Sequence, residues 1–121
     1  MTPGLRVFIC APYDDGGNLA GSPIVDANIH AVLDAHMRLR AMGFATYPEI
    51  LYRSMTDRYS ERATVEALQD AKAWIQASDM MLRIRSELTC RDAQVRESHA
   101  REFKVPVFYS LQAMLCRLNK G

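Results

Sequence analysis

The chain alternates short apolar runs with longer segments in which apolar residues recur every three or four positions. Short runs of this kind are typical of buried strands, and the longer segments are typical of amphipathic helices. The pattern therefore predicts a strand–helix unit repeated four times. The predicted strands cover residues 5–10, 44–47, 80–85 and 105–109, and the predicted helices begin near residues 22, 64, 90 and 110.

Local signals mark the ends of two of these helices. Ser22 before Pro23 is a favourable N-cap and first-turn pair, and Gly43 predicts the end of the same helix. Ser110 is expected to cap the last helix. One face of the first helix is predicted to consist of Val25, Ile29, Val32, Leu33, His36 and Arg40, and all but the last two of these are apolar.

The third predicted strand carries arginines on one face only. Alternate residues of a strand point to opposite sides of the sheet. The pattern indicates either one partly exposed face or arginines that reach a ligand. The apolar face holds Met80, Leu82 and Ile84, and the other face holds Met81, Arg83 and Arg85.

The order of the elements predicts an α/β fold. We expect a three-layer sandwich with a doubly wound parallel sheet of four to five strands in the order 2-1-3-4, flavodoxin-like or Rossmann-like. A chain of 121 residues is expected to form a single domain over residues 1–121. Such sheets bind ligands at the carboxyl ends of their strands. The predicted crevice lies near Tyr13 and Arg85, at the start of the helix that carries Glu97.

Glu97 lies at the edge of the stripe that this helix is predicted to bury. A carboxylate beside a buried face loses hydration, so it requires a partner or serves a task. The alternative is an exposed glutamate whose stem lies along the protein surface. The stripe itself consists of Ala93, Arg96, Ala100 and Phe103.

Composition narrows the classes of partner. The net charge of +1 gives no general attraction for a nucleic-acid polymer or a membrane surface, and no apolar run is long enough to span a bilayer. The N-terminal residues run into a strand with no secretory signal, and the three cysteines lack metal-ligand spacing. We therefore expect a cytoplasmic protein with reduced thiols and with no metal or cofactor.

Two other kinds of site compete for the crevice. Cys90 and Arg96 have the spacing of a phosphatase-like loop, but this loop has no glycine and carries Asp92, whose charge would repel phosphate. A phosphorylated receiver-type domain would use Asp14 and Asp15 for Mg²⁺. Its acceptor aspartate is missing, because residues 85–86 are Arg-Ser. Neither interpretation is favoured.

Several segments together resemble the nucleoside 2-deoxyribosyltransferase-like superfamily, including its small phage and bacterial members of unassigned function. The likeness covers residues 6 to 109, and it lies in the order and spacing of the motifs rather than in any one of them. The segments are VFICAPY at 7–13, Asn28 in the first long helix, Gly43-Phe44 to Pro48, Ala77-Ser78-Asp79, Glu97-Ser98-His99-Ala100 and Val105-Pro106-Val107.

The resemblance implies that Glu97 is a nucleophile. It would attack the anomeric carbon of a nucleoside or nucleoside 5′-monophosphate, as in a retaining glycosidase. The protein would then be an N-glycoside hydrolase or a 2-deoxyribosyltransferase. Tyr13 matches an aromatic position close to the nucleophile. The remaining residues implied in substrate binding are Ala11, Asn28, Asp79, Arg85, Arg91 and Ala93.

The chain departs from the family pattern just before Glu97. Arg91, Asp92 and Ala93 replace a small S-x-G approach to the helix. Arg91 either binds a phosphate there or fills the pocket, and Arg85 is a second candidate for the phosphate. The alternative function is therefore a non-catalytic nucleotide-binding module on the same fold.

The resemblance also implies a homodimer or a higher homo-oligomer. Related folds commonly complete the pocket with a neighbouring subunit. Candidate apolar surfaces are the last helix, through Met114, Leu115 and Leu118, and the helix that carries Trp74.

Overall fold

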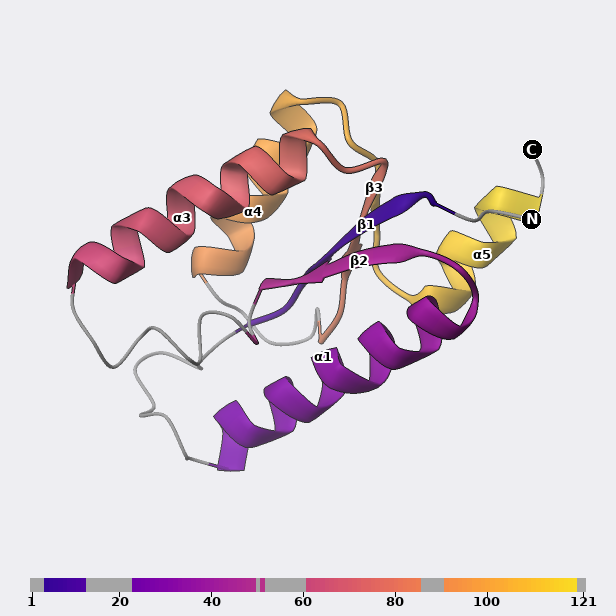
Figure 1. The fold of residues 1–121 in the computed structure, drawn as a ribbon, viewed down its shortest axis with the longest axis horizontal. Coiled ribbons are helices and arrows are strands. Elements are labelled where there is room, and N and C mark those ends of the chain that lie inside the picture. The colour runs from indigo at the N-terminus through magenta and orange to yellow at the C-terminus, as the bar shows by residue number, and fades with distance from the viewer. Residues whose placement is uncertain (1–3, 13–22, 50, 52–60, 86–90, 120–121) are drawn as a thin grey trace.

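The structure is a computed structural model, and it describes residues 4–12, 23–49, 51, 61–85 and 91–119 (Figure 1). Strands and helices alternate along the chain, as the apolar pattern predicts. The elements are β1 (Arg6–Cys10), α1 (Pro23–Ala41), β2 (Ala45–Pro48), α3 (Glu61–Gln76), β3 (Met80–Arg83), α4 (Arg91–Glu102), β4 (Val107–Phe108) and α5 (Leu111–Asn119).

The four described strands form one parallel sheet in the order β2-β1-β3-β4, which confirms the predicted order. Val7 of β1 pairs with Thr46 on one side and with Met80 on the other. The chain therefore leaves β1 in one direction to reach β2 and in the opposite direction to reach β3. This reversal places the switch point at the carboxyl ends of β1 and β3.

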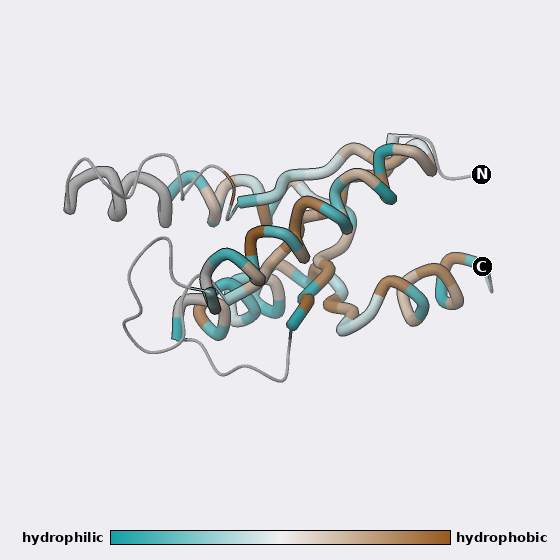
Figure 2. The backbone as a smooth tube through the Cα atoms, turned by 90° about the horizontal axis from the view of Figure 1, so that it is seen from below, coloured by the Kyte–Doolittle hydropathy of each residue, from teal (hydrophilic) through white to brown (hydrophobic). Residues whose placement is uncertain are grey.

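Helices cover both faces of the sheet, α1 and α5 on one side and α3 and α4 on the other (Figure 1). Alternate residues of β1 pack against the helices on opposite faces of the sheet. Val7 and Ile9 pack with α1 and α5, and Phe8 and Cys10 pack with α3 and α4. Strands buried on both faces explain why the sequence shows unbroken apolar runs. Figure 2 shows hydrophilic and hydrophobic residues alternating along the helices, as expected for elements with one buried side.

The ends of α1 and α4 close in the same way. The N–H of Phe44 donates to the carbonyl of Leu39 after α1, and the N–H of Val105 donates to the carbonyl of Ala100 after α4. These bonds belong to a Schellman-type end, which requires a residue with positive φ. Gly43 takes this position after α1 at φ 95°, whereas Lys104 takes it after α4 at φ 60°.

The buried stripe of α1 differs from the predicted one. Leu33 is 40% exposed and Arg40 is exposed, so these two residues of the predicted face do not belong to the buried stripe. The helix is rotated so that Ala35 and Leu39 continue the stripe from Val32. Apolar spacings of three and four residues are compatible with the predicted stripe and with the observed one. The observed stripe forms because its side chains fill the space between α1 and the sheet.

The two faces of β3 are both buried, so the predicted partly exposed face is wrong. Arg83 is only 3% exposed, because α4 covers this side of the sheet. The element also ends at Arg83 rather than at residue 85. Two further boundaries differ: α3 begins at Glu61, before residue 64, and β4 is limited to Val107–Phe108 by the preceding helix end.

The last helix does not offer the apolar surface that was expected. Met114 is fully buried, and Leu115 and Leu118 pack against the same core cluster. Ser110 caps this helix as predicted, since its hydroxyl accepts a hydrogen bond from the N–H of Ala113 at 3.0 Å. Trp74 of α3 is 47% exposed and remains a candidate contact surface. Over the described residues, no helix combines the length and the apolarity that crossing a membrane requires.

Candidate active site

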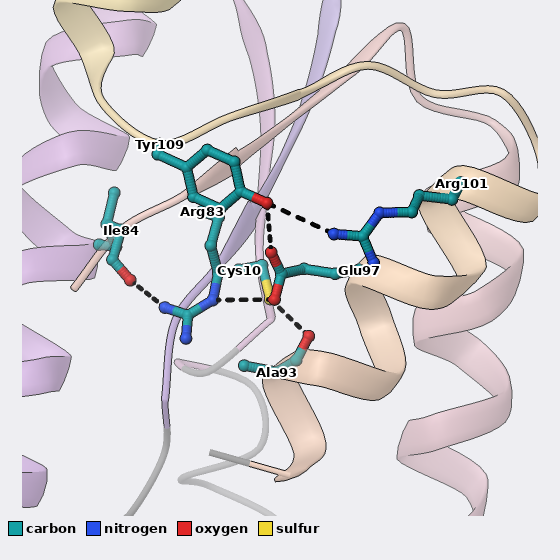
Figure 3. Close-up of polar contacts among 7 residues, drawn as sticks. All are labelled: Cys10, Arg83, Ile84, Ala93, Glu97, Arg101 and Tyr109. Atoms are coloured by element: carbon teal, nitrogen blue, oxygen red, sulfur yellow. Dashed lines mark hydrogen bonds and ion pairs between the residues drawn. The ribbon is translucent and has the colours of Figure 1, made fainter. Parts of the chain in front are cut away.

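Polar residues gather where the four strands end. Cys10 is the last residue of β1 and Arg83 the last residue of β3, while Glu49 directly follows β2 and Tyr109 directly follows β4. Parallel strands end at the same edge of a sheet, so these four side chains share one edge. Helix α4 places Glu97 against the same edge (Figure 3).

Glu97 is a buried carboxylate, 8% exposed, with a separate partner on each oxygen. The hydroxyl of Tyr109 donates a hydrogen bond to Oε1 at 2.9 Å, and Nε of Arg83 lies 3.7 Å from Oε2 (Figure 3). These contacts orient the carboxylate toward the strand ends. Because a carboxylate offers about four lone-pair positions, it can still accept a further contact from a ligand.

Arg83 is held in place by more than Glu97. Its Nη1 donates to the carbonyl of Ile84 at 2.5 Å (Figure 3). A guanidinium stays charged throughout the physiological pH range, so Arg83 supplies a permanent positive charge beside Glu97. A buried charge is tolerated only when it is paired, and the arrangement meets that condition for both residues.

Tyr109 links Glu97 to solvent. The hydrogen bond to Glu97 is the main cause that raises the pKa of the Tyr109 hydroxyl, and burial adds to it. Ionisation would place a phenolate beside the carboxylate, so Tyr109 stays a hydrogen-bond donor at neutral pH. Nη2 of Arg101 lies 3.5 Å from the same hydroxyl (Figure 3). Tyr109 is 50% exposed, so the side chain that contacts the buried Glu97 carboxylate also reaches the protein surface.

Cys10 is a buried thiol between the charged groups. Burial raises its pKa strongly, and the nearby Glu49 carboxylate raises it further. Its Sγ lies 3.9 Å from the carbonyl oxygen of Ala93, to which the thiol donates. Only a thiolate is a strong nucleophile, so Cys10 is unsuited to covalent catalysis at neutral pH.

Arg96, which directly precedes Glu97 in α4, pairs with Glu49. Its Nε and Nη2 lie 3.1 Å and 2.5 Å from Glu49 Oε1, and both side chains are buried. The arginine of the phosphatase-like motif is therefore committed to a carboxylate. Cys90 of that motif, like Asp14 and Asp15, lies outside the described residues.

The predicted substrate residues at the start of α4 and after β3 lie at this edge. Arg91 is exposed at the first position of α4, and Ala93 is buried one turn before Glu97. Arg85 is half-buried after β3 with a positive φ of 55°. Ala11 is buried directly after β1, on the α1 side of the sheet. Tyr13 lies outside the described residues.

Two other predicted residues do not lie beside Glu97: one is on the opposite face of the sheet and the other is at its opposite edge. Asn28 is fully buried on α1, across the sheet from Glu97. Asp79 precedes β3, and its Oδ2 accepts a hydrogen bond from the N–H of Arg6 at 2.7 Å. It therefore lies at the amino edge of the sheet and anchors the start of β1. The structure does not bring Asp79 together with Glu97.

The predicted substrate residues include neither Glu49 nor Tyr109, although a signal for both was present. Glu49 lies two residues after the predicted strand 44–47, and Tyr109 is the last residue of the predicted strand 105–109. The ends of parallel strands share one edge of the sheet. Arg83 carried a weaker signal through its place on the polar face of the third strand. Applying the strand-end rule to all four strands would have indicated the observed cluster.

The described residues contain no group of three or more histidine, cysteine, aspartate or glutamate side chains placed to hold a metal ion. A scan against protein-family models finds no match to the chain. A search of curated proteins finds no match either. The likeness to the nucleoside 2-deoxyribosyltransferase-like superfamily therefore rests on the motifs in the sequence.

Proposed function

We propose that the protein cleaves the N-glycosidic bond of a nucleoside or nucleoside 5′-monophosphate, or exchanges its base, with Glu97 as nucleophile. The observation that carries this proposal is the buried Glu97 carboxylate, held between Arg83 and Tyr109 at the strand ends of a doubly wound sheet. Ligands bind this edge in such folds. The motif resemblance assigns the same glutamate.

The contacts of Glu97 suit a two-step displacement. In the first step a Glu97 oxygen bonds to the anomeric carbon as the bond to the base nitrogen breaks, and the base takes up a proton from solvent. In the second step water, or a second base, attacks the same carbon, and water loses its proton to solvent. The carboxylate leaves as an anion. Arg83 and Tyr109 stabilise that anion by charge and by hydrogen bonding.

The alternative is a nucleotide-binding module without turnover. It is favoured by Arg91 at the start of α4, where a bulky charged side chain replaces the small residues of the family pattern. The two functions differ in one measurement. Purified protein is incubated with a panel of nucleosides and their 5′-monophosphates, and free nucleobase is quantified by chromatography. Base release supports catalysis, and binding with no release on any substrate supports the module.

Tyr109→Phe is expected to lower kcat by about 10- to 100-fold with little change in KM. Phenylalanine keeps the ring and removes one hydrogen bond to a charged group, which contributes roughly 1.5–3 kcal/mol. Tyr47→Phe on β2 is the control, since its ring stacks on Trp74 away from Glu97. Equal losses in the two variants would contradict a role for the Tyr109 hydroxyl.

We expect Tyr109→Phe and the wild type to differ in stability at alkaline pH. The pKa of Tyr109 is raised in the folded protein, so its protonated form stabilises the fold below its usual pKa of about 10. That contribution is lost as pH rises through the folded value. Thermal unfolding from pH 8 to 11 should therefore show a steeper loss of Tm in the wild type than in Tyr109→Phe.

Arg91→Ala is expected to weaken binding of 5′-monophosphates about 10-fold and to leave nucleosides nearly unchanged. Arg91 is exposed at the N-terminus of α4, where backbone N–H groups and the helix dipole also favour an anion. Arg117→Ala on α5 is the matched control, since this arginine is exposed on another helix. Titration calorimetry measures both ligand types, and an equal loss on both would contradict a phosphate contact.

A further inference from the structure

Asn28 is an anomaly among the buried side chains. It has no exposed surface, and neither Oδ1 nor Nδ2 has a hydrogen-bond partner in the part of the chain that the structure describes. Burying an amide without partners is costly, and buried polar groups are almost always paired. An apolar residue at position 28 would pack α1 against the sheet without burying unpaired polar atoms. The stability of the fold therefore does not explain why the residue is an asparagine.

The position of Asn28 along the strand direction follows from a contact that another residue of α1 makes with β2. His36 Nδ1 lies 2.5 Å from Thr46 Oγ1, which sets His36 level with the second residue of β2. Asn28 is two turns closer to the N-terminus of α1, about 12 Å along the helix axis. A strand covers that distance in roughly four residues. Asn28 is therefore level with the carboxyl ends of β1 and β2, on the face of the sheet that α1 covers.

Asn28 and Glu97 thus lie at the same edge of the sheet but on opposite sides of it. Helix α1 covers one face and α4 covers the other (Figure 1). The binding crevice of a doubly wound sheet lies outside the strand ends, where it is reached from both faces. One ligand can therefore meet groups from both helices there.

We propose that Asn28 is retained to bind the nucleobase of the ligand rather than to support the fold. This inference rests on the proposed function, because that function supplies the nucleobase. A primary amide presents an acceptor and a donor side by side, and its complement has an adjacent donor and acceptor. Nucleobase edges carry such pairs, and asparagine recognises them in this way. A phosphate or carboxylate offers acceptors alone and would leave Oδ1 unpaired.

The test compares stability and binding in one series of variants. Asn28→Leu keeps the branched shape and removes both polar atoms, Asn28→Ala removes the amide without adding volume, and His30→Leu is an exposed control on the same helix. Thermal unfolding is recorded without ligand and with each of adenosine, guanosine, cytidine and thymidine. We expect Asn28→Leu to raise the ligand-free Tm by roughly 5 °C. We also expect both Asn28 variants to lose at least 10-fold in nucleoside affinity.

The possible results separate this inference from the proposed function. A lower ligand-free Tm in both Asn28 variants would assign the amide to the fold and overturn the inference. Unchanged nucleoside affinity in the variants would overturn it as well, while base release by the wild type would still support catalysis. If the wild type binds nucleosides without releasing base and the Asn28 variants lose that binding, the catalytic proposal fails and the inference stands.

Discussion

Glu97→Gln is expected to reduce base release by about 1,000-fold or more, equivalent to roughly 4 kcal/mol or more of activation free energy. Glutamine has nearly the shape of glutamate but cannot form the glycosyl ester. Its amide oxygen can still accept the hydrogen bond that Tyr109 donates to Glu97. Arg83 keeps its hydrogen bond to the carbonyl of Ile84. We therefore expect the fold and the affinity for nucleosides to be retained, with a lower Tm than the wild type because the buried Arg83 charge loses its carboxylate partner.

The measurement is a time course of base release under saturating substrate, with binding followed separately by calorimetry. Glu102→Gln is the matched control, because Glu102 is an exposed glutamate at the end of the same helix. Retention of more than a tenth of wild-type turnover by Glu97→Gln would rule out Glu97 as the nucleophile. Loss of nucleoside binding together with turnover would instead indicate that the carboxylate holds the ligand.

The fold could be predicted from the sequence because its signals are local. The central strands β1 and β3 are buried on both faces and appear as apolar runs. Gly43 and Ser110 mark helix ends by their own backbone and side-chain chemistry. The element order then restricts the sheet to few topologies. The observed order β2-β1-β3-β4 follows from these rules.

The site could be predicted only in part, because its contacts join distant residues. Glu97 was indicated by its position at the edge of a helical stripe. Its partner Tyr109 is visible only once β4 is placed beside β3. Glu49 and Arg96 are 47 positions apart, and nothing local in either segment indicates their pairing. The rotation of α1 likewise depends on how the helix packs against the sheet.

The Arg96–Glu49 pair leads to the largest expected change in stability. Both side chains are buried, and the shortest N–O distance is 2.5 Å. Removing one partner of a buried pair leaves an uncompensated charge and costs about 3–5 kcal/mol. For a chain of this size Arg96→Leu should therefore lower Tm by roughly 10–20 °C. The exposed pair of Arg38 with Asp34 is the control, and Arg38→Leu should change stability by less than about 1 kcal/mol.

The double variant Glu49→Leu, Arg96→Leu separates the cost of an unpaired charge from the contribution of the pair itself. Replacing both members of a buried pair by apolar residues is often neutral or stabilising. We expect the double variant to recover most of the stability lost in Arg96→Leu, as measured by urea unfolding. Recovery of stability in the double variant would mean that the fold does not require the Arg96–Glu49 pair. The role of the pair would then lie in the strand-end site, where Arg96 directly precedes Glu97. A double variant as unstable as Arg96→Leu would show that Arg96 stabilises the fold through contacts other than Glu49.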